Sequence, residues 1–226
     1  MPWPLRTPTE AQGSVRRALP LLLAAAILSV AASWATLRRG DRPPPVPAEA
    51  EGQVRTIYPE SAQPDMRLPD GRHERIRSLL NVDRRMRYGE FVWNDDGVPA
   101  GRAWIRVDLA TQTVSIFRSG HEIGTAVILY GTDGHATPTG AFRVLEKDKD
   151  HWSRSYDAAM PYMLRLTDDG VAIHASDVVK GFATHGCIGV PLAFARHLFE
   201  AMNRDDSVVI LSGENGGIPA GQPKSS

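Results

Sequence analysis

The sequence contains a single cysteine, Cys187, among its 226 residues, so the chain cannot form an internal disulfide bond. Its basic and acidic side chains balance to a formal net charge of zero, and it has no long basic run. This charge pattern gives no indication of a nucleic-acid partner. Apolar residues make up 42% of the chain, which at this length is enough for one good-sized domain with appendages.

The N-terminal region contains a long apolar run. The run from Ala18 to Leu37 carries no charge, and Arg16 and Arg17 precede it. At about 1.5 Å per residue, a helix of this length spans a hydrocarbon core of roughly 30 Å. We therefore expect residues 18–37 to be a transmembrane signal anchor with residues 1–17 in the cytoplasm, or alternatively a cleaved signal peptide. Both alternatives place the bulk of the chain in the cell envelope or periplasm.

The composition changes after this run. Residues 40–65 are rich in proline, which predicts an extended spacer rather than a packed structure. Residues 66–99 are expected to be a helical or irregular lead-in, because apolar residues at loose helical spacing predict a short, strongly charged helix over residues 70–88. Residues 213–226 are expected to be a flexible tail.

From Arg102 onward, apolar and polar residues alternate with the period of β-strands. Ser119-Gly120 is a hairpin turn signal, and the segment from Leu192 to Met202 has the apolar spacing of a helix. The pattern predicts a mainly β domain over residues 100–212, a β-sandwich or barrel with one main helix after the cysteine. The predicted strands are 104–109, 113–118, 122–130, 142–145, 162–166, 171–174 and 207–211.

Two histidines stand near the cysteine in sequence. His185 lies two residues before Cys187, and His174 lies at the end of a predicted strand, from which a loop leads back to the thiol. A thiol becomes a useful nucleophile when a neighbouring base or cation raises its thiolate fraction. In an extended segment His185 and Cys187 would share a face, and Gly186 between them would let backbone N–H groups turn toward an oxyanion.

Two other interpretations of these residues are open. A lone cysteine is most often a small buried apolar residue, and the domain could then be a non-catalytic binding module in which the cysteine has no chemical role. A zinc-dependent hydrolase is the second alternative, but tetrahedral zinc needs three or four ligands, and the remaining candidates, His121, His135 and His151, are scattered. We expect no metal and no organic cofactor.

The residues around the thiol resemble the signature of the L,D-transpeptidase family, the YkuD-type catalytic domain of peptidoglycan enzymes. That signature is an upstream His, a spacer, then Ser/Thr-His-Gly-Cys, an apolar residue and usually Arg or Asn. His174 and Thr184-His185-Gly186-Cys187-Ile188 match it, and Gly189 departs from it. The resemblance continues upstream through Trp104-Ile105-Arg106-Val107-Asp108-Leu109, Thr137-Pro138-Thr139-Gly140 and Met160-Pro161-Tyr162.

The resemblance implies a cysteine-dependent acyl transfer on peptidoglycan stem peptides, with Cys187 as the nucleophile. It implies that His174 is the general base, that His185 assists, and that the Ala175 carbonyl orients the base. Gly186 would contribute to the oxyanion site. The positions expected to contact substrate are Tyr162, Met163, Thr184 and Gly189. A carboxypeptidase or wall-trimming hydrolase using the same site is an alternative function.

Overall fold

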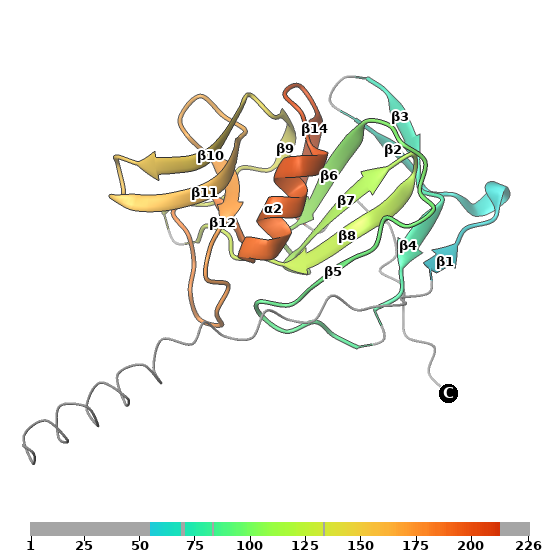
Figure 1. The fold of residues 1–226 in the computed structure, drawn as a ribbon, viewed down its shortest axis with the longest axis horizontal. Coiled ribbons are helices and arrows are strands. Elements are labelled where there is room, and N and C mark those ends of the chain that lie inside the picture. The colour runs from blue at the N-terminus through green and yellow to red at the C-terminus, as the bar shows by residue number, and fades with distance from the viewer. Residues whose placement is uncertain (1–54, 69–70, 83, 133, 213–226) are drawn as a thin grey trace, which may run out of the picture. The chain divides into compact units, whose positions relative to one another are not determined.

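Most of the regular secondary structure of the described residues is β-strand, as the period-two pattern predicts. The computed structural model describes residues 55–68, 71–82, 84–132 and 134–212 (Figure 1). The strands of these residues are β1 (Arg55–Ile57), β2 (Asp65–Arg67), β3 (His73–Arg75), β4 (Ser78–Leu80), β5 (Phe91–Trp93), β6 (Ala103–Asp108), β7 (Thr113–Arg118), β8 (His121–Val127), β9 (Gly140–Arg143), β10 (Glu146–Ser153), β11 (Ala158–Arg165), β12 (Ala172–Ala175), β13 (Ile188–Val190) and β14 (Ser207–Leu211). Their helical segments are the α-helix α2 (Leu192–Ala201) and the 3-10 turn η1 (Glu60–Ala62). The prediction of a mainly β fold with a helix after the cysteine is confirmed.

The larger sheet has the strand order β1-β4-β8-β7-β6-β14-β9, and β5 also pairs with β8, at residues 124–126. Its centre is built from β6 and β7, where Ile105, Val107, Val114 and Ile116 are fully buried on one face. The alternation of β-branched residues favours this pleated, half-buried arrangement. The turn between β7 and β8 falls at Ser119-Gly120, as predicted.

The smaller sheet has the order β10-β11-β12-β13 and carries the candidate site. The strands β11 and β12 form an antiparallel hairpin, as the sequence predicts, but β12 and β13 are parallel. A parallel pair needs a crossover connection, and here residues 176–187 provide it. The strand β10 was not predicted, because its sequence of alternating charges, Glu-Lys-Asp-Lys-Asp-His, has no apolar face.

The two sheets and α2 share one hydrophobic core, and in Figure 1 the helix lies across the junction of the sheets. The apolar spacing of α2 turns Phe194, Ala195 and Leu198 into this core, where all three are almost fully buried. The fully buried core residues of the smaller sheet are Leu164, Ile173, Ile188 and Val190. This packing fixes β12 and β13, and with them the residues on their opposite face.

The prediction of a charged helix over residues 70–88 is wrong. The segment contains β3 and β4, and the described residues from 81 to 88 form no helix. The apolar residues Ile76 and Leu79 pack instead against Trp104 and Phe117 on the outer face of the larger sheet. A few apolar side chains at loose spacing fit a short strand as well as a helix, and burial against an existing sheet decides between them.

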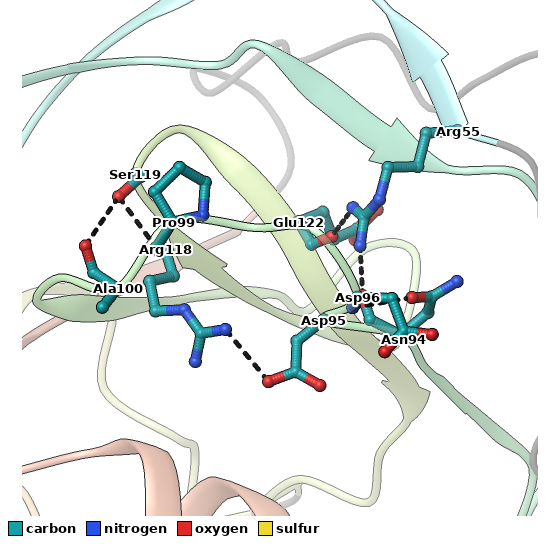
Figure 2. Close-up of polar contacts among 9 residues, drawn as sticks. All are labelled: Arg55, Asn94, Asp95, Asp96, Pro99, Ala100, Arg118, Ser119 and Glu122. Atoms are coloured by element: carbon teal, nitrogen blue, oxygen red, sulfur yellow. Dashed lines mark hydrogen bonds and ion pairs between the residues drawn. The ribbon is translucent and has the colours of Figure 1, made fainter.

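The end of the predicted spacer is also structured. Residues 55–57 form β1, which pairs with β4 at the edge of the larger sheet, so the expected linker over residues 40–65 is wrong at its C-terminal end. The guanidinium of Arg55 donates hydrogen bonds to the backbone carbonyls of Glu122 and Asn94 (Figure 2). These bonds tie β1 to the main domain, where Glu122 belongs to β8.

The side chain of Glu122 is buried beside this contact. Its Oε2 accepts a hydrogen bond of 2.8 Å from the backbone N–H of Leu80. Burial raises the pKa of Glu122 to about 7, and the opposing effects of Ser115, the Leu80 N–H, Arg55 and Arg106 do not cancel it. The native protein therefore binds a proton at Glu122 more tightly than the unfolded chain does.

We expect the stability of the domain to fall as the pH rises from about 4.5 to 7, because Glu122 loses its proton in the unfolded chain in that window while the native protein still holds it. The contribution is roughly 3 kcal/mol, since one pKa unit corresponds to about 1.4 kcal/mol. Glu122→Gln removes this titration. Urea unfolding of the wild type and of Glu122→Gln between pH 4 and 8 measures this pH dependence of the stability. The stability of the variant relative to the wild type should increase through the window, and a constant difference would contradict the prediction.

Several predicted segments lie outside the described residues. They are the cytoplasmic residues 1–17, the membrane segment 18–37, the first part of the spacer and the tail 213–226. Among the residues that the structure does describe, no helix has the length and apolar character needed to cross a membrane.

Candidate active site

Cys187 and His174 are brought to the same face of the smaller sheet. The register pairs Ile173 with Ile188 and His174 with Gly189, and Cys187 stands immediately before β13. Because successive side chains of a strand alternate between faces, Ile173 and Ile188 point into the core while His174 points to the opposite face. The sulfur of Cys187 packs on that opposite face against Met160, Met163 and Ala172.

His174 is held by the backbone of the next residue. Its Nδ1 lies 2.8 Å from the carbonyl oxygen of Ala175, the contact that the family resemblance implied for this pair. A carbonyl only accepts, so Nδ1 carries the proton and Nε2 is left as the basic nitrogen. Burial lowers the pKa of His174, and nearby His151 lowers it further, whereas the hydrogen bond to the Ala175 carbonyl raises it. The net shift is downward, so the ring is neutral at pH 7.

Cys187 is a half-buried, protonated thiol. Its sulfur lies 3.8 Å from the carbonyl oxygen of Gly170. Burial raises the pKa of the thiol, a backbone hydrogen bond from Ala172 opposes this, and the carboxylate of Asp169 adds to it. The expectation that a neighbouring group raises the resting thiolate fraction is therefore not met. A neutral imidazole and a neutral thiol can instead react by proton transfer during attack.

His185 lies in a cluster of rings at the rim of the site. Its ring stacks on Tyr156 with centroids 4.9 Å apart and meets the edge of His135 at 5.1 Å. Residues 185–187 are not an extended segment, because Gly186 has a φ of +107° and the chain bends there. His185 and Cys187 consequently do not follow the simple same-face rule of a strand.

The predicted substrate contacts fall at different places. Met163 lies beside Cys187, whereas Tyr162, its neighbour on β11, packs on the core side against Phe199 at 5.7 Å between ring centroids. The hydroxyl of Thr184 donates a hydrogen bond to the carbonyl of Cys187. In this structure the side chain therefore stabilises the cysteine loop. Of these three residues, Met163 alone lines the cleft at the thiol.

Gly189 is packed tightly between two neighbouring segments. It is buried and exchanges two backbone hydrogen bonds of 2.9 Å with Leu129. A Cβ placed on it would lie 2.9 Å from the Cβ of Ser176 and 3.5 Å from that of Leu129. A side chain at position 189 would therefore require these neighbours to move, because they already occupy the space beside the glycine. The substrate contact expected at Gly189 stays a prediction.

The thiol lies in an open cleft of about 720 Å³ between the β10–β11 hairpin and the 168–172 turn. Met160, Met163 and Ala172 form its apolar part next to Cys187. Trp152 and Tyr156 of the hairpin are more than half exposed at its rim. The charged residues that line the cleft are Glu146, Asp148, Arg154, Arg165, Asp168 and Asp169.

Sequence reasoning missed the contribution of this hairpin. The cluster of two aromatic residues among charged ones between residues 146 and 157 was the available signal, since exposed aromatic residues on a polar segment often mark binding surfaces. Two basic residues, Arg154 and Arg165, also line the cleft. In the described part of the chain, no group of three or more His, Cys, Asp or Glu side chains is arranged to hold a metal ion.

The backbone next to the thiol is packed tightly against the loop that follows β8. A Cβ on Gly131 would lie 2.0 Å from the carbonyl oxygen of His135 and 2.5 Å from the backbone nitrogen of Gly186. Real Cβ atoms do not approach backbone atoms so closely, so only glycine fits. Gly131 also forms an isolated parallel β-bridge with Thr184, whose N–H donates a hydrogen bond of 3.1 Å to the Tyr130 carbonyl.

We expect Gly131→Ala to lower the free energy of unfolding by at least about 2 kcal/mol, because the added methyl group forces backbone atoms apart. Gly134→Ala in the same loop is the matched control. A Cβ there meets nothing within 4 Å, so the cost is only that of a left-handed alanine, about 1 kcal/mol. Urea unfolding measures both. Equal losses for the two variants would show that the contact between Gly131 and the cysteine loop is not tight.

One family model matches the part of the chain that holds these residues. A family model described as the L,D-transpeptidase catalytic domain, YkuD, matches residues 102–210. No curated protein sequence matches the chain. The matched segment contains β6 to β13, α2 and most of β14, together with His174 and Cys187.

The similar solved structures include an L,D-transpeptidase from Stackebrandtia nassauensis, 24% identical with a TM-score of 0.47, where the match covers 53% of this chain and 60% of that one. An L,D-transpeptidase from Mycobacterium tuberculosis H37Rv is 20% identical with a TM-score of 0.46 and coverages of 49% and 57%. A cysteine-to-serine mutant of an Enterococcus faecium L,D-transpeptidase is 25% identical with a TM-score of 0.45 and coverages of 49% and 50%. The chain thus spans less than two thirds of the length of each. The family model of the L,D-transpeptidase catalytic domain, YkuD, thus matches residues 102–210 of the chain, and this segment holds both His174 and Cys187.

Proposed function

We propose that this protein is a cysteine-dependent peptidoglycan L,D-transpeptidase that uses Cys187 as its nucleophile. The observation that carries the proposal is the pairing of β12 with β13, which sets the basic His174 and the thiol on one face of the sheet. The thiol also lines an open cleft. The family of residues 102–210 supplies the substrate class, which is a stem peptide of peptidoglycan.

The first step is acylation of the thiol. The sulfur attacks the carbonyl of the third residue of a stem tetrapeptide, and the bond to the terminal D-alanine breaks. Nε2 of His174 takes the thiol proton as the sulfur attacks and gives it to the leaving amine. The neutral states of both groups suit this role, since a protonated imidazole could not accept the proton.

The second step is transfer of the acyl group from the thioester. An amine acceptor attacks the same carbonyl, His174 accepts its proton, and the thiol is regenerated. An amine from a second stem peptide produces a crosslink, whereas water produces a tripeptide and makes the enzyme a carboxypeptidase. The backbone N–H groups at Gly186 and Cys187 stabilise the oxyanion of both tetrahedral intermediates.

The cleft offers surroundings suited to a peptide with charged ends. Arg154 and Arg165 line it and can pair with a stem-peptide carboxylate, and Asp169 can pair with an ammonium group. Such an ammonium would also offset the effect by which Asp169 raises the pKa of the thiol. The exported location implied by residues 18–37 would place the domain where peptidoglycan is found.

Incubation of the purified protein with a disaccharide-tetrapeptide tests the proposal. We expect release of D-alanine together with a dimer, a tripeptide or both, at a rate unaffected by a chelator. The ratio of dimer to tripeptide decides between transpeptidase and carboxypeptidase activity. Loss of turnover on chelation would support the zinc-dependent alternative, and the absence of any product under conditions where Cys187 reacts with an alkylating agent would support a binding module.

A further inference from the structure

Thr137 connects two backbone segments that meet next to the thiol. Its side chain is buried, with 5% of the residue exposed. The hydroxyl oxygen accepts a hydrogen bond of 2.9 Å from the N–H of Gly131 and donates one of 2.9 Å to the carbonyl of Gly186. One hydroxyl thus joins the loop after β8 to the residue that precedes Cys187.

The bond to Gly186 determines how the next N–H is oriented. The peptide unit between Gly186 and Cys187 is planar and trans, so its carbonyl and its N–H point in opposite directions. By holding the Gly186 carbonyl toward itself, Thr137 turns the N–H of Cys187 away from the loop after β8. That N–H is the donor nearest to the sulfur along the chain, and a donor beside the nucleophile is what a tetrahedral oxyanion requires.

The surroundings allow this peptide unit little freedom to rotate. The φ of +107° at Gly186 belongs to a region that favours glycine, and Gly131 leaves no space for a Cβ beside the Gly186 backbone. On the other side of the cysteine, the hydroxyl of Thr184 holds the Cys187 carbonyl. Threonine hydroxyls therefore fix the peptide units on both sides of Cys187.

We propose that Thr137 is a positioning residue that orients the N–H of Cys187 as an oxyanion donor through its hydrogen bond to the Gly186 carbonyl. The inference rests on the proposed role of Cys187 as a nucleophile. It does not depend on the natural substrate. Thr137 touches neither the sulfur nor the cleft lining, so its effect on chemistry passes through the backbone.

Two reactions of the Cys187 thiol distinguish an effect of Thr137 on the oxyanion donor from a general effect of Thr137 on the packing of the loop. In single-turnover acylation by p-nitrophenyl acetate, the sulfur–acyl bond forms, the ester C–O bond breaks, and p-nitrophenolate leaves through a tetrahedral oxyanion. Alkylation by iodoacetamide displaces iodide at an sp³ carbon and forms no oxyanion. Only acylation should depend on the orientation of the Cys187 N–H.

The variants are Thr137→Val, which removes the hydroxyl at similar size, and Thr137→Ser, which keeps it. We expect Thr137→Val to slow acylation at least about 10-fold while alkylation changes by less than about twofold, and Thr137→Ser to restore acylation to within about threefold. The exposed Thr139→Val in the same loop is the matched control and should change neither rate. If Thr137→Val does not fold, Thr137→Ala serves as the hydroxyl-free variant.

Three results would overturn the proposal. They are equal losses of acylation and alkylation in the hydroxyl-free variant, an unchanged acylation rate, and failure of Thr137→Ser to restore it. Acylation of the wild-type thiol no faster than that of free cysteine would overturn it as well, since no oxyanion site would then be present. Turnover of the disaccharide-tetrapeptide is measured separately, so a wrong substrate class would leave these rates unaffected.

Discussion

Replacement of Cys187 by alanine or serine should abolish turnover of a stem tetrapeptide, with a loss of roughly 1,000-fold or more. Alanine has no nucleophile. Serine has an oxygen whose proton is far harder to remove, and the half-buried site that already raises the pKa of the thiol would disfavour an alkoxide further. Release of D-alanine from a disaccharide-tetrapeptide measures the effect.

The same substitutions should leave the fold intact. Cys187 is partly buried at the margin of a small cluster with Met160, Met163 and Ala172, outside the main core. The cavity left by either substitution is small, so the free energy of unfolding should change by no more than about 1 kcal/mol. A large loss of thermal stability in both variants would instead identify Cys187 as a structural residue and remove the basis for covalent catalysis.

Replacement of His174 by alanine should slow acylation at least about 100-fold, the usual effect of losing a general base. The wild-type rate should rise as the pH increases through the pKa of His174, which burial holds below its ordinary value near 6.5, because only the neutral ring accepts the thiol proton. In His174→Ala this low-pH rise of the rate, the low-pH limb of the profile, should disappear. The rate should then increase only as the pH approaches the raised pKa of the thiol.

His185→Ala is the comparison for this experiment. His185 is exposed and contacts the rings of Tyr156 and His135, so its loss should cost less than that of His174 and should leave the low-pH limb in place. Single-turnover acylation between pH 5 and 9 distinguishes the two variants. A smaller loss for His174→Ala than for His185→Ala, or a low-pH limb that persists without His174, would mean that the two histidines have exchanged roles.

The central features of the fold and site could be predicted from the sequence because short-range patterns determine them. The alternation of apolar residues in 103–118 defines two strands, and the hairpin at 158–175 places His174 at a strand end. The Thr-His-Gly-Cys motif pointed to the thiol. A strand directly after the cysteine was not predicted, so the parallel pairing of β12 with β13 became visible only in the structure.

Other features depend on contacts between distant segments, which no local pattern contains. The charged strand β10 has no buried residue, and it pairs with β11 along its length. Tyr162 and Met163 are adjacent, and only the register of β11 decides that Met163 faces the thiol. The crowding around Gly189 could not be predicted either, because the neighbours that limit a side chain there, residues 129 and 176, come from other segments of the chain.

The protonation state of the thiol could not be predicted either. Sequence proximity of two histidines favoured a thiolate, but the pKa depends on burial and on the nearby Asp169, which belongs to the β11–β12 turn. The positioning role proposed for Thr137 also depends on a contact between segments that are distant in sequence. Its hydroxyl reaches Gly186 across 49 residues of sequence, and a turn motif gives no sign of such a contact.

Mass spectrometry of the protein after brief exposure to a disaccharide-tetrapeptide tests the central claim most directly. We predict a mass increase equal to the donor without its terminal D-alanine, located by peptide mapping on Cys187 and removed by an amine acceptor. His174→Ala should accumulate the adduct far more slowly, and Cys187→Ser should not form the thioester. D-alanine release by the Cys187→Ala variant at the wild-type rate, or an adduct mapped to another residue, would contradict the account.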